Sequence, residues 1–146
     1  MLHSKQLEII EENTRLDSKK IKSHMITFFE HVLKWKYQPE RYEVSWIRSI
    51  IDNSIIVRDL IYKEYPNKRN SNVFNKASET IRDAYEQGKI NAAGITGKSI
   101  IKNDVFIWNS FNTLESISNL DYVKIWLIKN AITDEMINGV NKNTRV

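Results

Sequence analysis

Glu8, Glu11 and His31 are the side chains whose types come closest to a chemical site. Carboxylates and imidazole are the groups used in general acid–base catalysis and in transition-metal sites. These three would meet if a first helix carrying the glutamates packed against a second helix carrying the histidine. One histidine and two carboxylates make a poor ligand set for a metal ion without a further ligand. We therefore predict a hydrogen-bonded network between two helices, with His31 buried and no metal bound.

Residues 92–99, Ala-Ala-Gly-Ile-Thr-Gly-Lys-Ser, match a loose nucleotide-binding pattern with alanine at the first glycine position. A phosphate-binding loop needs a buried strand before it and a helix after it, so that backbone N–H groups converge on the phosphates. The residues that precede this stretch, 80–91, read instead as a charged helix. A helix that ends in a glycine turn explains the stretch better. A nucleotide- or metal-dependent enzyme therefore ranks third among the possible functions, and we predict no cofactor.

Large aromatic side chains cluster where one helix should end and the next should begin. Pro39 disfavours helical backbone at the residue before it, so the incoming helix should stop near Tyr37. Ser45 is a good N-cap for a helix that starts at Trp46. Because indole rings bury much surface, we expect Trp35 and Trp46 to be largely buried at this aromatic corner.

Basic side chains surround the aromatic corner. Arginine and lysine interleaved with aromatic rings can hold phosphates and stack nucleobases. Acidic residues such as Glu40 and Glu43 interrupt this basic field, so ordinary ion pairing on a solvated rim is the simpler interpretation. The corner is still a candidate interface, formed by Trp35, Tyr37, Arg41, Trp46 and Arg48.

The positive charge of the chain is concentrated in its middle. The formal net charge is +4, and residues 65–98 contain six basic and three acidic side chains. The six are Lys68, Arg69, Lys76, Arg82, Lys89 and Lys98. They are spread along a loop and a helix rather than packed in a run, which favours a solvated surface over a nucleic-acid footprint. A nucleic-acid-binding module that uses this region is the second functional hypothesis.

The block from residue 31 to residue 46 resembles a bacterial family, the domain of unknown function family 29. That family's pattern reads roughly His-Leu-Leu-Lys-Trp-Gln-Tyr-Gln-Pro-Glu, followed after a short spacer by Ser-Trp. The matching residues here are His31, Leu33, Lys34, Trp35, Tyr37, Gln38, Pro39, Glu40, Ser45 and Trp46. The resemblance covers roughly residues 7–93, and Asn53 and Ser54 replace a Gln-Arg pair of the family. It implies an all-helical fold and no particular activity.

Hydrophobic periodicity predicts four main helices, at about residues 2–13, 19–37, 45–65 and 70–88. In the first, Leu7 and Ile10 should face inward. Asp17 and Ser18 could cap the second, whose apolar residues recur every three or four positions, as expected for a helix with one buried face. The predicted fold class is all-α, an antiparallel bundle of four main helices with an additional C-terminal segment. The short β-branched and aromatic runs of that segment suit either strands or buried helices, and we favour helices.

We expect a single domain over residues 1–146, in which a family-like bundle (1–98) carries a C-terminal extension (99–146) packed on it. In the fourth helix, the small Ala77, Ala84 and Gly88 should let another helix approach closely. The chain has no cysteine, which excludes a disulfide framework. It also has no apolar run long enough to span a bilayer. A cytoplasmic location without membrane contact is the plain expectation.

The C-terminal extension is unusually apolar for a segment outside the predicted bundle. Trp108, Phe111 and Trp126 are its candidate interface residues. We expect it to fold back on the bundle and to leave part of its apolar face for an interface, most simply in a symmetric homodimer.

The function that these patterns favour is that of a non-enzymatic small helical protein of immunity or helper type, which acts by binding a protein partner that the sequence does not name.

Overall fold

The computed structural model describes residues 4–38, 41, 43–63 and 68–131. Every element in this part of the chain is helical, which confirms the predicted all-α fold. The elements are α1 (Ser4–Tyr37), α2 (Val44–Ile61), α3 (Ser71–Ser78), α4 (Ile81–Thr96), the 3-10 helix η2 (Ser99–Asn103), α5 (Phe106–Phe111), α6 (Leu114–Ser118) and α7 (Leu120–Ala131).

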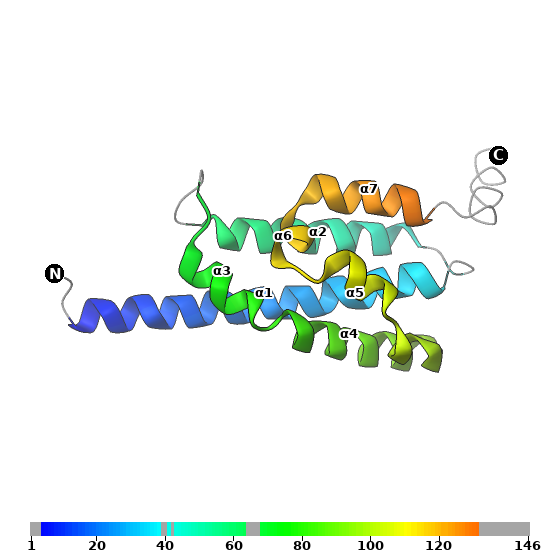
Figure 1. Ribbon diagram of the computed structural model, residues 1–146, viewed down its shortest axis with the longest axis horizontal. Coiled ribbons are helices and arrows are strands. Elements are labelled where there is room, and N and C mark those ends of the chain that lie inside the picture. Colours follow the sequence, from blue (N-terminus) through cyan, green and yellow to red (C-terminus); the bar gives the residue numbers. More distant parts are fainter. Residues whose placement is uncertain (1–3, 39–40, 42, 64–67, 132–146) are drawn as a thin grey trace.

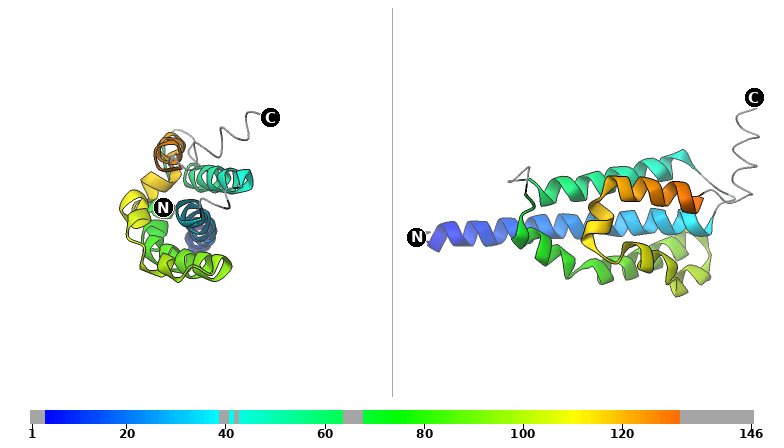
Figure 2. Two further views of the ribbon diagram at one scale, coloured as in Figure 1. Left: turned by 90° about the vertical axis from the view of Figure 1, so that its right-hand side faces the viewer. Right: turned by 45° about the horizontal axis from the view of Figure 1, so that its top comes forward.

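Helix α1 forms the axis of the molecule, and the other helices pack around one part of it (Figure 1). Helix α2 returns antiparallel to α1, α3 and α4 run back along another side, and α7 lies beside α2. The end-on view in Figure 2 shows α2, α7 and α4 arranged around α1, with α5 and α6 crossing between α4 and α7. The result is a bundle of long helices closed by short ones.

Helix α1 is a single helix of 34 residues, so the expected break between residues 13 and 19 was wrong. Asp17 and Ser18 do not cap a new helix but lie buried within α1. The Asp17 carboxylate pairs with Lys63 Nζ at 3.3 Å, and the Ser18 hydroxyl donates to the Arg15 carbonyl. Because neither proline nor glycine interrupts this stretch, the helix continues through it.

The apolar stripe of α1 forms the centre of the core. Ile21, Met25, Phe28, Val32 and Trp35 are all buried, as the helical spacing predicts. Aromatic rings extend this core into the other helices by edge-to-face contacts. These contacts join Phe28 to Phe111, Phe29 to Tyr85, and Phe111 to Trp126, with ring centroids 5.0–5.4 Å apart.

Helix α4 approaches α1 closely at Gly88, as predicted. A Cβ atom added at Gly88 would lie 2.7 Å from the Phe29 Cβ. The predicted helix over residues 70–88 is divided, however, into α3 and α4. Between them, the Thr80 hydroxyl donates to the Ala77 carbonyl at 2.7 Å, a side-chain bond that competes with the helical pattern. Helix α4 then continues to Thr96 and ends at Gly97, which has a φ of 71°.

Residues 99–131 fold back on the bundle and are helical wherever they form regular structure. Some of their apolar side chains, such as Ile107 and Phe111, join the core that α1 and α2 form, so this part of the predicted extension shares one core with the bundle. Others, such as Ile125 and Ile128, stay exposed. The rest of the extension, residues 132–146, lies outside the described residues, as do the turn at Pro39 and the predicted end of the third helix at residue 65. Helix α2 itself ends at Ile61.

Candidate functional site

The predicted network of Glu8, Glu11 and His31 does not form, because all three residues lie on α1. Twenty or more residues of helix separate the histidine from the glutamates by roughly 30–35 Å. Both glutamates are exposed, and His31 is half-buried rather than buried, with its Nδ1 2.9 Å from the Thr27 carbonyl oxygen. Among the described residues, no three His, Cys, Asp or Glu side chains are grouped so that they could hold a metal ion.

The aromatic corner belongs to the core. Trp35 and Trp46 are 4% and 8% exposed, which confirms the prediction that they are buried. Arg41 and Arg48 are exposed beside them. Because the two indole rings face inward, they do not offer a surface on which a partner could stack.

Two of the three candidate residues in the C-terminal extension are also part of the core. Phe111 and Trp126 are buried and contact each other, so the prediction that they form an interface was wrong. Trp108 is half-buried and packs on Tyr85, with the Arg82 guanidinium 4.6 Å from its ring centroid. The Phe111 and Trp126 rings therefore pack inside the bundle.

A buried carboxylate, Asp104, forms a polar cluster that the sequence analysis missed. It accepts hydrogen bonds from the hydroxyls of Tyr37 (2.5 Å) and Tyr85 (2.7 Å) and from the Ile107 backbone N–H (3.0 Å). Burial, together with the Asp104 carboxylate, raises the pKa of both tyrosines well above the usual range. Both hydroxyls therefore stay protonated as donors. The only local sign of this role was the position of Asp104 just before α5, where an aspartate can accept a backbone N–H. The two tyrosines could not be predicted as its partners, because they lie far from Asp104 in the sequence.

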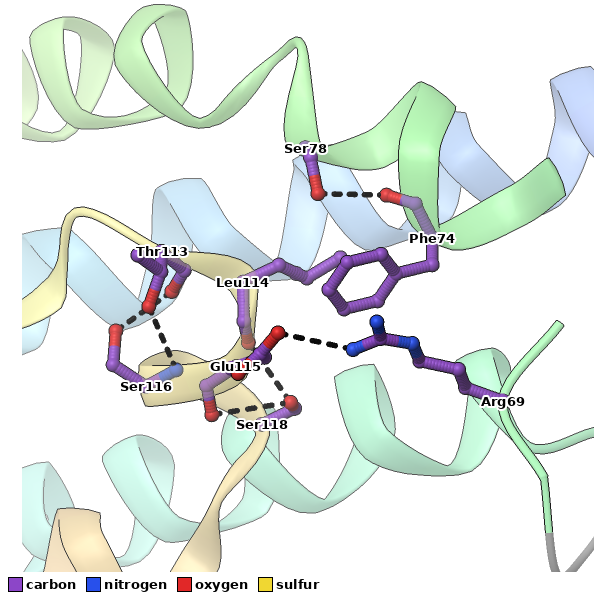
Figure 3. A network of polar contacts seen from close by, with 8 residues as sticks. All are labelled: Arg69, Phe74, Ser78, Thr113, Leu114, Glu115, Ser116 and Ser118. Atoms are coloured by element: carbon purple, nitrogen blue, oxygen red, sulfur yellow. Dashed lines mark hydrogen bonds and ion pairs between the residues drawn. The ribbon is translucent and has the colours of Figure 1, made fainter. Parts of the chain in front are cut away.

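Most of the basic side chains in residues 65–98 are engaged within the molecule. Arg69 lies 3.9 Å from the Phe74 ring centroid and pairs with Glu115 at 3.0 Å, as Figure 3 shows. Arg82 and Lys89 both pair with Glu86, at 3.0 and 3.1 Å. Lys98 donates to the Tyr37 carbonyl at 2.9 Å. Lys68 and Lys76 are exposed, but two lysines make a small footprint for a polyanion.

A surface hollow of about 490 Å³ lies where the end of α2 meets α3, α6 and the start of α7. Arg58 and Arg69 line it, but each already pairs with a carboxylate, Asp59 and Glu115 respectively. The hollow therefore brings together charges of both signs that neutralise one another.

The first part of α1, residues 4–16, extends beyond the helices that pack around the rest of α1 (Figures 1 and 2). We call it the projecting segment. Leu7 and Ile10 are 45% and 43% exposed. Both had been expected to face inward against a second helix, and they are exposed because α1 does not turn back on itself. Their spacing continues the stripe that is buried further along α1. Ile9 and Leu16 are also exposed, on the opposite side of the helix.

Residues 5–123 match the family described as domain of unknown function DUF29. The chain belongs to the DUF29 family. The match runs well past residue 93, so the resemblance seen in the sequence was too short, and most of the segment after residue 98 belongs to the DUF29 domain. No curated protein and no solved structure shows significant similarity to the chain.

Asn53 and Ser54, which replace a Gln-Arg pair of the DUF29 pattern, have structural roles here. The Asn53 side-chain oxygen lies 2.8 Å from His24 Nδ1, which links α2 to α1. The Ser54 hydroxyl donates to the Ile117 carbonyl at 2.7 Å, which links α2 to α6. Both side chains are buried, so neither is available to a ligand.

Of the helices that the structure describes, none is both long and apolar enough to span a lipid bilayer.

Proposed function

We propose that this DUF29 protein is a non-enzymatic helical protein that acts by binding another protein through its projecting segment. The observation that carries this proposal is the exposure of Leu7 and Ile10 on the stripe of α1 that elsewhere forms the core. An amphipathic helix binds a partner through apolar residues spaced three or four positions apart. A helper- or immunity-type role, in which a small bundle holds one partner, fits this arrangement.

Two observations favour protein binding over the alternatives. The projecting segment carries Glu8, Glu11 and Glu12, and such acidic residues disfavour contact with a nucleic-acid backbone. Within the part of the chain that the structure describes, Asp104 is the one buried carboxylate with several polar partners; it is 4% exposed and already accepts three hydrogen bonds. It therefore acts as a structural joint between helices and is not a group presented to a substrate.

The test is affinity capture from the native host with three forms of the chain. The first is the natural chain, the second carries Leu7→Ser and Ile10→Ser, and the third carries Ile9→Ser and Leu16→Ser as a matched control on the opposite side of the same segment. We expect a protein that co-purifies with the natural chain and the control but not with the Leu7/Ile10 variant. A partner that the Leu7/Ile10 variant retains would show that another surface binds it.

A further inference from the structure

We propose that one end of the bundle binds the surface of an anionic lipid bilayer. The binding surface lies where α1 and α4 end, at the far end of α1 from the projecting segment (Figure 1). We call it the basic patch, and it consists of three exposed apolar side chains and the three lysines beside them: Ile100, Val105, Phe106, Lys36, Lys98 and Lys102. The basic patch shares no residue with the projecting segment, so binding at one does not require binding at the other.

The chain around η2 is held so that apolar side chains of the basic patch point outward. Ile101 and Asp104 are 0% and 4% exposed, and they lie three residues apart, which is one turn of a 3-10 helix. Their neighbours Ile100 and Val105 are therefore directed away from the bundle, and they are 64% and 68% exposed. Because two tyrosine hydroxyls fix Asp104, this arrangement exists before any partner binds.

The three lysines come from different parts of the chain. Lys36 Nζ lies 3.9 Å from the centroid of the Phe106 ring, and Lys98 Nζ donates to the Tyr37 carbonyl at 2.9 Å. Lys102 is exposed within η2. The lysines therefore gather where the end of α1 meets η2 and the start of α5, next to the apolar side chains.

No exposed carboxylate offsets this positive charge along the segment that carries most of the basic patch. Between Glu86 and Glu115 the chain has a single acidic residue, Asp104, and its carboxylate is buried. Glu43 is exposed just before α2, but α2 packs on a different side of α1 from α4 (Figure 2). The basic patch therefore complements a partner that carries negative charge.

The apolar side chains favour lipid over other anionic partners. Ile100 projects from a 3-10 helix and Val105 from the residue before α5, so they do not form a stripe on one helix. Three such side chains cover far less than the roughly 800 Å² that each partner buries in a standard protein interface. A nucleic-acid backbone would match the lysines but not the apolar groups. A bilayer takes up protruding apolar groups while its headgroups attract the lysines beside them.

Binding of this kind needs no membrane-spanning helix. The expectation of no membrane contact rested on the lack of a long apolar run, and that lack bears only on a spanning segment. Three lysines and three apolar side chains supply a weak attachment, and added salt should reverse it because salt screens the attraction to the headgroups.

Sedimentation with lipid vesicles tests the proposal on the full chain. We expect the natural chain to sediment with vesicles of phosphatidylcholine and phosphatidylglycerol, but not with vesicles of phosphatidylcholine alone, and to be released at high salt. Lys102→Glu should weaken binding about tenfold, and so should Ile100→Ser combined with Val105→Ser. The matched control, Ile125→Ser combined with Ile128→Ser on α7, should leave binding unchanged, since these two side chains are also exposed, at 51% and 61%.

A natural chain that does not bind the anionic vesicles overturns the proposal, as does a control variant that loses as much binding as the Ile100/Val105 variant. Stronger binding to polyglutamate than to the anionic vesicles would identify an acidic protein as the partner and also overturns it. The Leu7/Ile10 variant should bind vesicles as the natural chain does, even if the proposed function fails. Loss of vesicle binding in that variant would assign the lipid contact to the projecting segment and overturn the proposal.

A polarity-sensitive fluorophore gives a second readout, because the natural chain contains no cysteine to which it could attach. Attached through Val105→Cys, the fluorophore should emit at shorter wavelength when anionic vesicles are added, because it enters the less polar boundary of the bilayer. Attached through Ile128→Cys on α7, it should show no shift. Equal shifts at the two positions, or no shift at Val105→Cys, would overturn the proposal.

Discussion

Asp104 is a buried carboxylate whose hydrogen-bond donors come from three helices. Tyr37 lies at the end of α1, Tyr85 on α4 and Ile107 in α5. Removing a carboxylate from water is costly unless donors replace the lost hydration, and here three donors do so. At the scale of single residues, this cluster fixes the segment after α4 against the bundle.

Asp104→Ala should destabilise the protein by about 2–4 kcal/mol, because two tyrosine hydroxyls and a backbone N–H lose their buried acceptor. Denaturant unfolding measures this change. The exposed Asp52 offers a matched control, since Asp52→Ala should change stability by less than about 0.5 kcal/mol. Equal effects of the two substitutions would contradict the role given to Asp104.

The same cluster predicts a loss of stability at alkaline pH. Because burial and the Asp104 carboxylate raise the pKa of Tyr37 and Tyr85 in the folded state, the unfolded state loses these protons first. The stabilisation is therefore complete below about pH 10, the ordinary tyrosine pKa, and falls as the pH rises above it. The variant with Tyr37→Phe and Tyr85→Phe should lose less stability between about pH 9 and 11 than the natural chain. Parallel curves would contradict this linkage.

At the scale of elements, periodicity predicted the buried face of α1 but not its length. The spacing of the apolar residues from Ile21 to Trp35 was sufficient to predict the buried face, because a helix with a single apolar stripe turns that stripe towards the core. The continuation through Asp17 could not be predicted, because Lys63, the residue that pairs with it, lies 46 positions away. From the sequence alone, an aspartate that caps a helix cannot be distinguished from one that forms a buried ion pair within a helix.

Replacing each of two glycines of α4 with alanine should change the stability of the protein in opposite directions. At Gly88 a Cβ would meet the Phe29 Cβ at 2.7 Å, whereas at Gly94 it would meet nothing within 4 Å. We expect Gly88→Ala to destabilise the protein by about 1–3 kcal/mol through overpacking. Gly94→Ala should stabilise it by roughly 0.5–1 kcal/mol through helix propensity. Denaturant unfolding of the two variants checks this, and the reverse order would mean that α4 does not pack on α1 at Gly88.

At the scale of the whole molecule, the sequence located the aromatic side chains but not the binding surface. Trp46, Phe111 and Trp126 are equally suited to a core or an interface, and only the path of the chain decides between them. That path places them inside and leaves Leu7 and Ile10 outside. The projecting segment is therefore a property of the assembled fold, which no local pattern indicates.

Amide hydrogen exchange with and without the partner that affinity capture identifies tests most directly whether the projecting segment binds protein. A helical end without packing partners opens readily, so residues 4–16 should exchange quickly at about 10 µM. With an excess of that partner we predict slower exchange in these residues alone, and no such change in the Ile10→Ser variant, with Ile9→Ser as the control that behaves like the natural chain. Exchange in residues 4–16 that the partner leaves unchanged, or protection that appears on another helix instead, would contradict the account.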